Sequence, residues 1–165
     1  MRFLNAFIVL FCFCSTANAQ LDGLFITSHY QKTDFFASVE GGFKLTDKFT
    51  TRTGLGAGIR RTFLQQRFFP QLNQAINWNV INQEKRIKFG PELSFGLSRY
   101  KITDKVTASY LTGRLGYFFC YNFNSNWAIF QTTTLARERE YLSIGSQVNY
   151  WTINGSLGVK YDWKR

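Results

Sequence analysis

Few residues in this chain of 165 have the side-chain chemistry that catalysis or metal binding requires, because it contains one histidine and three cysteines. The histidine, His29, follows Ser28, so a base and a hydroxyl nucleophile are adjacent in the sequence. A catalytic pair of this kind also needs a third group, usually a carboxylate, that orients the histidine. No such carboxylate is evident, and we therefore expect His29 to have no catalytic role.

The cysteines and glycines give no stronger sign of a catalytic or cofactor site. Cys12 and Cys14 lie in an N-terminal segment that we expect to be removed, so Cys120 is expected to be a lone, buried structural thiol. A single histidine provides no metal-ligand spacing, and we expect neither a metal nor a cofactor. The glycine-rich run from Gly54 to Gly58 superficially resembles a phosphate-binding loop, but no helix follows it and its glycines share one strand face.

The charge balance indicates an acidic partner. Lysine and arginine number 20 against 10 aspartate and glutamate residues, which gives a formal net charge of +10. Nucleic acid, anionic lipid and the phosphates of lipopolysaccharide all have the matching charge. Aromatic residues make up 18% of the chain, a content that argues against disorder.

The elements that position these residues have the two-residue period of β-strands. Segments 35–45 and 49–60 flank the short turn Thr46, Asp47 and Lys48. One face of the first segment carries Phe35, Ala37, Val39, Gly41, Phe43 and Leu45. Each segment exceeds ten residues, and a tilted strand needs about 9–11 residues to cross a bilayer. The hairpin therefore predicts a unit of a transmembrane β-barrel.

The same alternation recurs along the chain and predicts eight strands. They are expected at 21–30, 35–45, 49–60, 74–80, 86–98, 107–122, 127–136 and 151–163. Short turns (46–48, 82–85, 124–126) alternate with mostly longer connections (31–34, 61–73, 99–106, 137–150). Pro91 has no N–H for a ladder, so a bulge or local break is expected there. The predicted fold is an all-β, antiparallel, up-and-down barrel of eight strands.

The N-terminus has the pattern of an export signal. A basic start at residues 1–2 precedes an almost entirely apolar run at 3–13, and 17–19 read Ala-Asn-Ala, a small-x-small cleavage pattern. The apolar run is too short for a spanning helix. We expect a cleaved signal peptide at 1–19 and a barrel domain at 20–165.

Alternation alone leaves two arrangements open, since a secreted soluble ligand-binding barrel has its apolar face inside. Three features favour a membrane barrel with its polar face inside: glycines crowd that face, the opposite face is nearly free of charge, and aromatic residues gather at the turn ends. The glycines are Gly42, Gly54, Gly56, Gly58, Gly90, Gly96, Gly116 and Gly158. The aromatic residues are Phe43, Phe49, Tyr121, Trp127, Tyr161 and Trp163.

In strand number, turn asymmetry and facing, the chain from Gln20 to Arg165 resembles the small eight-stranded bacterial outer-membrane barrels, the group of the OmpA transmembrane domain and OmpX. The resemblance implies an outer-membrane location, and a monomer is expected. The short turns and the even number of strands place both termini in the periplasm. The missing His–Ser–carboxylate set argues for a non-enzymatic protein with a structural or loop-mediated binding role. Members of that group commonly end on an aromatic residue, whereas this chain ends Trp163-Lys164-Arg165. An alternative is a lipid A-modifying outer-membrane enzyme, since some of these barrels act through a histidine and a serine near the outer leaflet.

Charged residues on the glycine-rich face are the first group of candidate site residues. Charges in a narrow, low-dielectric interior are costly unless paired. The predicted lumen network consists of Glu40, Arg52, Lys88, Glu92, Arg114, Lys160 and Asp162. We expect each glutamate to pair with an arginine or a lysine across the lumen and the interior to be too full for a wide channel.

Basic residues near the longer connections are the second group. They are Arg60, Arg61, Arg67, Arg99, Lys101, Lys105, Arg137 and Arg139. At the outer membrane surface they would meet the anionic head groups of lipopolysaccharide. The expected partners are therefore outer-membrane lipid and lipopolysaccharide rather than nucleic acid.

Overall fold

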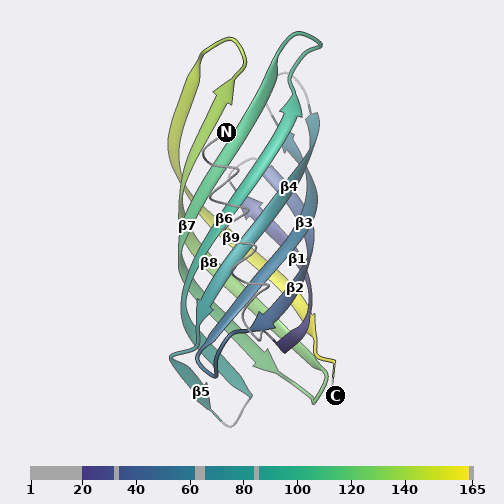
Figure 1. The fold of residues 1–165 in the computed structure, drawn as a ribbon, viewed down its shortest axis with the longest axis vertical. Coiled ribbons are helices and arrows are strands. Elements are labelled where there is room, and N and C mark those ends of the chain that lie inside the picture. Colours follow the sequence, from purple (N-terminus) through teal and green to yellow (C-terminus); the bar gives the residue numbers. More distant parts are fainter. Residues whose placement is uncertain (1–19, 32–33, 62–65, 84–85, 164–165) are drawn as a thin grey trace.

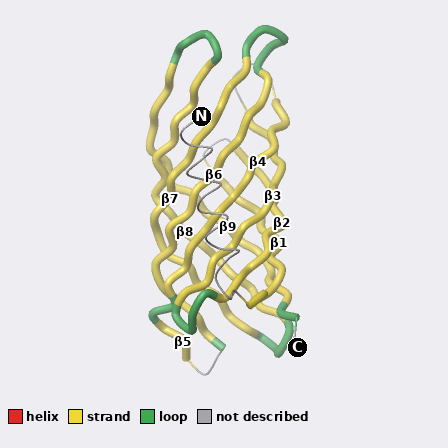
Figure 2. The backbone as a smooth tube through the Cα atoms, in the orientation of Figure 1, coloured by secondary structure: helices red, strands yellow, loops and turns green. Residues whose placement is uncertain are grey.

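The computed structural model describes residues 20–31, 34–61, 66–83 and 86–163, so the predicted signal peptide lies outside the described residues. The strands are β1 (Gln20–Gln31), β2 (Asp34–Lys44), β3 (Phe49–Arg61), β4 (Gln66–Trp78), β5 (Ile81–Gln83), β6 (Ile87–Lys101), β7 (Thr107–Asn122), β8 (Trp127–Leu142) and β9 (Gln147–Tyr161). Figures 1 and 2 show these strands tilted around one axis, with turns and loops at the two ends.

The strands form one closed antiparallel sheet. Their order is β4-β3-β2-β1-β9-β8-β7-β6-β5, and an additional pairing of β4 with β6 closes the barrel. Because β4 and the short β5 follow each other along β6, the segments occupy eight positions in the wall. Through the body of the barrel each strand is therefore paired on both sides. The predicted eight-stranded up-and-down barrel is confirmed.

The polar face of the barrel lies inside and the apolar face outside. Glu40 and Arg52 on the inner face are each 3% exposed, whereas Leu55 and Ile153 on the outer face are 69% and 73% exposed. This distribution suits a wall surrounded by lipid and reverses that of a soluble barrel. The soluble ligand-binding alternative is therefore rejected.

Aromatic side chains form a girdle at the end of the barrel that carries the short turns. Trp127 packs edge-on against Tyr161 with ring centroids 4.9 Å apart, and Tyr161 packs against Trp163 at 5.8 Å. Phe49 stacks on Trp78 at 6.0 Å at the same end. Amphipathic rings of this kind collect at membrane–water interfaces.

The irregularity expected at Pro91 is found in the partner strand. β6 is continuous through Pro91, which stays in register with Tyr117 of β7. Opposite it, the partner is interrupted between Trp78 and Ile81, at the gap that separates β4 from β5. Since proline cannot donate a ladder hydrogen bond, the neighbouring chain bends away there.

The strands reach farther toward the long-loop end than the sequence indicated. Most of the predicted connection 61–73 belongs to β4, whose Phe68 and Leu72 pair with Ile59 and Leu55 of β3. The predicted connections 99–106 and 137–150 shrink to 102–106 and 143–146. Ladder pairing with the neighbouring strand extends these segments although their own apolar alternation is weak.

Two hairpins stand above the rest of the wall at that end, the upper end in Figure 1. They are the β6–β7 and β8–β9 hairpins, which close at residues 102–106 and 143–146. The β7–β8 ladder joins them as far as the Ala108–Leu142 pair. Among the described residues, no helix has the length and apolar character needed to cross a bilayer.

Candidate functional site

The centre of the lumen holds an ion cluster formed by Arg52 of β3, Glu40 of β2 and Glu92 of β6, here called the Arg52 cluster. Arg52 Nη1 donates to Glu40 Oε2 at 3.1 Å, and Nη2 donates to Glu92 Oε2 at 2.6 Å. All three side chains are buried. One guanidinium therefore satisfies both glutamates, with a separate nitrogen for each carboxylate.

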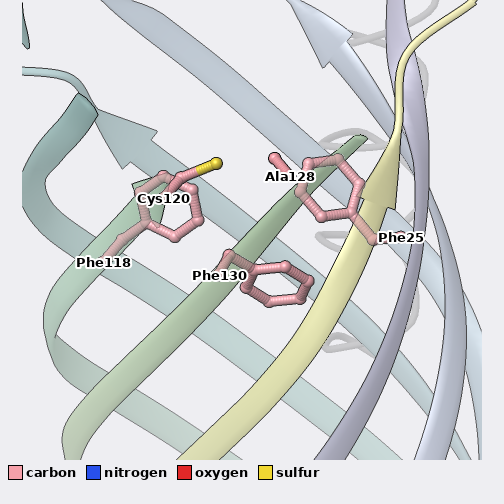
Figure 3. Packing of buried hydrophobic residues seen from close by; sticks show 5 residues of the cluster. All are labelled: Phe25, Phe118, Cys120, Ala128 and Phe130. Atoms are coloured by element: carbon pink, nitrogen blue, oxygen red, sulfur yellow. The ribbon is translucent and has the colours of Figure 1, made fainter. Parts of the chain in front are cut away.

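Three phenyl rings surround the same guanidinium, here called the phenyl layer. The Arg52 Cζ atom lies 5.2 Å from the ring centroid of Phe25, 5.6 Å from that of Phe118 and 4.9 Å from that of Phe130. Figure 3 shows these rings, with Cys120, pointing into the interior from β1, β7 and β8. Because β8 lies across the barrel from β3, Arg52 spans the lumen. Cation–π contacts stabilise a desolvated guanidinium.

A second ion cluster lies nearer the short turns. Lys160 Nζ of β9 is 2.6 Å from Asp22 Oδ2 and 2.5 Å from Asp162 Oδ1, and 5.5 Å from the ring centroid of Phe25. Asp22 occupies a register irregularity of β1 between Leu21 and Gly23. The predicted network contained Lys160 and Asp162, and the structure adds Asp22.

The remaining members of the predicted network lie on the inner face but outside these two clusters. The guanidinium of Arg114 is 5.8 Å from the ring of Phe36, toward the long-loop end, and the side chain is buried. Lys88 is half-buried in register with Cys120. Within the described part of the chain, Lys88 forms no ion pair. Arg114 lines the same small cavity as Glu40, Arg52 and Glu92.

An aromatic layer fills the lumen toward the long-loop end. Phe36, Phe69, Tyr100 and Tyr110 are buried together with Ala108. The Tyr100 hydroxyl donates to Glu140 Oε1, which satisfies its polar atom. The lumen therefore contains aromatic side chains on both sides of the Arg52 cluster.

His29 has a hydroxyl and a carboxylate beside it: the hydroxyl is that of Ser38 rather than Ser28, and the carboxylate, Glu40, was not evident from the sequence. Ser28 faces outward and donates to the carbonyl of Leu157 at 3.0 Å, because adjacent residues of a strand point to opposite faces. His29 Nε2 instead lies 2.9 Å from Ser38 Oγ, and Ser38 donates to Glu40 Oε1 at 2.8 Å. The ring also stacks on Phe36 with centroids 4.1 Å apart.

The order of these three groups does not match a nucleophilic triad. In a triad the histidine stands between hydroxyl and carboxylate and takes the hydroxyl proton. Here Ser38 stands between His29 and Glu40 and gives its proton to the carboxylate. His29 Nε2 also lies 3.6 Å from Glu40 Oε1. Both His29 and Ser38 therefore contact the carboxylate that pairs with Arg52.

The open space beside these residues is small. A cavity of about 20 Å³ lies among His29, Glu40, Arg52, Glu92 and Arg114. A water molecule needs at least about 10–15 Å³ measured in this way. The space is sufficient for water and too small for a lipid substrate.

Glycines on the inner face of β3 make room for the ion cluster. A Cβ added at Gly54 would lie 2.5 Å from Glu40 Cα and 2.7 Å from its Cγ. A Cβ added at Gly56 would lie 2.9 Å from Ser38 Cβ. The glycine-rich run that resembles a phosphate loop is therefore a packing surface for β2.

Cys120 is 1% exposed, and its thiol lies 3.7 Å from Asn122 Oδ1. It lies in a buried group with Phe25, Phe118, Ala128 and Phe130. No group of three or more histidine, cysteine or acidic side chains within the described ranges could hold a metal ion.

The predicted basic residues lie at or near the long-loop end of the barrel. Arg99 and Lys101 lie in the last three residues of β6, and Lys105 lies in the following loop. Arg137 and Arg139 lie on the outer face of β8. Arg137 stacks over Trp151 at 5.8 Å from its ring centroid. Arg60, Arg61 and Arg67 belong to β3 and β4, where Arg60 pairs with Arg67 in register, but their side chains lie outside the described residues.

Sequence reasoning missed Asp22, Ser38, Phe25 and Phe130 as contacts of the charged residues. Strand parity places Ser38 and Phe25 inside, and both side chains are buried. Parity identifies the face of a residue but not its height, that is, its position along the barrel axis. Height depends on the register between strands, which no single strand's sequence contains.

Comparison with solved structures identifies the fold. The chain is similar to the N-terminal β-barrel domain of Pseudomonas aeruginosa OprF, with a TM-score of 0.52 and 13% identity over 88% of this chain and 100% of that one. It is similar to a major outer membrane protein from Thermus thermophilus, with a TM-score of 0.51 and 11% identity over 87% and 100%. No family model and no curated protein sequence matches the chain. The predicted resemblance to outer-membrane barrels is confirmed at the level of the fold.

Proposed function

We propose that the chain is a non-enzymatic, monomeric integral protein of the bacterial outer membrane with a closed lumen and a basic outer end that binds lipid. The observation that carries this proposal is the Arg52 cluster. A single guanidinium spans the lumen between Glu40 and Glu92 and lies among the three rings of the phenyl layer. Eight strands enclose an interior just wide enough for side chains, and these side chains leave a cavity of about 20 Å³.

The closed lumen is tested by conductance in planar bilayers. We expect no steady porin-like conductance from the wild-type protein, because an ion would have to displace buried, paired charges. The triple variant Arg52→Ser, Glu40→Gln and Glu92→Gln removes the charges and shortens the spanning side chain, so small openings are expected from it. A steady large conductance from the wild-type protein contradicts the closed lumen.

The outer-membrane location and its orientation have a separate test. The protein should fractionate with the outer membrane and show heat-modifiable gel mobility. In a Cys120→Ser background, single cysteines in loops 102–106 or 143–146 should react with an impermeant reagent on intact cells. Labelling of a cysteine in the turn 123–126 instead would show that the barrel has the opposite orientation.

The basic end supports the lipid-binding part of the proposal. Arg99, Lys101 and Lys105 lie at one end of the barrel, close to where an anionic outer leaflet would be. A basic residue near a charged membrane surface contributes about 1 kcal/mol. Neutralising several of them should lower the lipopolysaccharide that co-purifies, and unchanged co-purification contradicts this role.

The surroundings of His29 favour the absence of enzymatic activity over the lipid A-modifying alternative. Ser28 faces away from His29, and Ser38 gives its proton to Glu40 rather than to the ring. The group also lies beside a cavity of about 20 Å³ inside the wall. A His29→Ala variant should therefore leave the acylation pattern of lipid A unchanged in cells that make the protein.

A further inference from the structure

The barrel wall separates between β4 and β6 near the basic end. Their ladder runs from Asn77 and Glu92 to Gln71 and Ser98 and stops there. The next residue of β4 is Pro70, which has no N–H to donate, and its carbonyl accepts a hydrogen bond from the Ser98 hydroxyl. Beyond this point the described ladders join β4 to β3 and β6 to β7.

A groove of about 600 Å³ lies on the outer surface at this separation. Its floor is a row of leucines on four neighbouring strands, where cross-strand pairs join Leu55 to Leu72, Leu72 to Leu97, and Leu97 to Leu111. These residues have the outward register, so the row faces lipid. A continuous strip of leucine side chains favours contact with a hydrocarbon chain.

The end of the groove nearer the long loops is basic and polar. One step beyond the leucines, Arg99 of β6, Ser109 of β7 and Tyr141 of β8 form a cross-strand row that lines the groove. Ser109 is short, so it leaves a notch between two long side chains. Arg139 on β8 pairs with Leu111 at the end of the leucine row. Two guanidinium groups thus stand beside one apolar floor.

Both arginines have charge available for a ligand. Arg99 is exposed and Arg139 is half-buried on the outer face. Within the described part of the chain, neither forms an ion pair with a carboxylate. A guanidinium offers paired N–H donors that match the oxygens of a phosphate.

A second outer groove gives the contrast. It measures about 270 Å³ and is lined by Leu24, Ile26, Trp127, Val159 and Tyr161 near the short turns. It has a similar apolar floor but no basic side chain in its lining. An uncharged acyl chain alone would fit either groove. A lipid with an anionic head group fits only the larger groove, because that groove has a basic side chain in its lining.

We propose that the groove at the β4–β6 separation binds one acyl chain of a phosphorylated outer-leaflet glycolipid of the lipopolysaccharide class, with a phosphate held between Arg99 and Arg139. The site rests on the proposed outer-membrane location, which puts the basic end in the outer leaflet. Phosphates and several acyl chains on one small head group place charge next to hydrocarbon. The groove has the same order, because Arg99 lies one step beyond the leucine row and Arg139 lies at the end of that row.

The test is native mass spectrometry of the mature protein extracted from outer membranes in mild detergent, with bound glycolipid and phospholipid counted per barrel. Ser109→Trp fills the notch, and Thr133→Trp adds similar bulk on the outer face between Tyr117 and Gly155. We expect Ser109→Trp to lower bound glycolipid about ten-fold, which corresponds to losing contact with about two methylene groups. Thr133→Trp should retain it.

A charge variant gives an independent measurement. Arg99→Ala should lower bound glycolipid about five-fold, the loss expected for one basic contact at an anionic surface. Arg86→Ala removes the same charge from an exposed position beside the opposite turn and should have no effect. Only variants that keep heat-modifiable gel mobility, and are therefore folded, are compared.

Three results would overturn the assignment. Equal retention by Ser109→Trp and Thr133→Trp would mean that the lipid is unspecific annular lipid. Equal loss of bound glycolipid from Arg99→Ala and Arg86→Ala would contradict the proposed phosphate contact of Arg99. Equal depletion of phosphatidylglycerol would mean that the groove binds any anionic lipid rather than the glycolipid. None of these results affects the conductance and fractionation tests, so failure of the groove and failure of the proposed function are distinguishable.

Discussion

The barrel contains the same chemical unit, a cation beside a carboxylate, in two opposite environments. In the lumen, the Arg52 cluster is buried and lies among phenyl rings. In the first turn, Lys44 Nζ lies 2.6 Å from Asp47 Oδ1, and the Asp47 side chain is 92% exposed. Water solvates the charges of Lys44 and Asp47 whether or not they pair. In the lumen, no solvent replaces a lost partner. The distance between the atoms is similar, so burial determines how much each pair matters.

The largest expected effect comes from removing the central cation. Arg52→Met removes the guanidinium that pairs with both carboxylates, and breaking a buried pair in this way costs about 3–5 kcal/mol. Urea unfolding of the protein in lipid vesicles measures the loss of free energy. Adding Glu40→Gln and Glu92→Gln to Arg52→Met should recover most of it, and no recovery would show that lost packing rather than charge is responsible.

A smaller effect is expected when one carboxylate is made neutral. Glu92→Gln keeps an acceptor near Arg52 but loses a hydrogen bond between charged groups, worth about 1.5–3 kcal/mol. Glu40 still pairs with the guanidinium, so no charge is left alone. The thermal midpoint in detergent should fall clearly, whereas Lys105→Ala in an exposed loop should hardly change it. Equal midpoints for the two variants would contradict the assigned inner face.

The cluster near the short turns lies between these extremes. Lys160 is 3% exposed, but its partners Asp22 and Asp162 are 16% and 24% exposed at the side chain. Water can screen the two aspartates, so Lys160→Met should cost about 1–2 kcal/mol, between the values for exposed and buried pairs. The same urea unfolding measures it. A cost as large as that of Arg52→Met would show that water does not reach this end.

The smallest effect is expected at the turn. The hydrogen bond and the charge of Lys44 hold the pKa of Asp47 below its usual 3.8. A carboxyl whose pKa is lowered by folding stabilises the fold above its ordinary pKa and loses that contribution as the pH falls through the folded value. Because Asp47 is fully exposed, solvent screens this contribution. Asp47→Asn should therefore match the wild-type unfolding midpoint at pH 7 and at about pH 3. A large shift at pH 7 alone would mean that exposure does not weaken the pair.

Strand parity determined which face each residue occupies, and the sequence carries parity directly. The alternation around Glu40, Arg52 and Glu92 predicted an inner face, and all three side chains are buried. The period and the length of the strands predicted the barrel, and the glycines, the charge-free face and the aromatic residues at the turn ends predicted which face lies inside. These features are local, because a period of two depends only on neighbouring residues.

Register and the ends of the strands were decided by the tertiary structure. Whether Glu92 would pair with Arg52 or Arg114 depends on the offset between strands that are distant in sequence, and the ladders bring it to Arg52. The same offset places Ser38 rather than Ser28 beside His29. β8 continues to Leu142 and β9 begins already at Gln147, because each strand is paired with a neighbour there. Their own sequences alternate only weakly in these parts. Hydrogen bonds between strands fix height in a barrel, and a single strand carries no information about the offset of its neighbour.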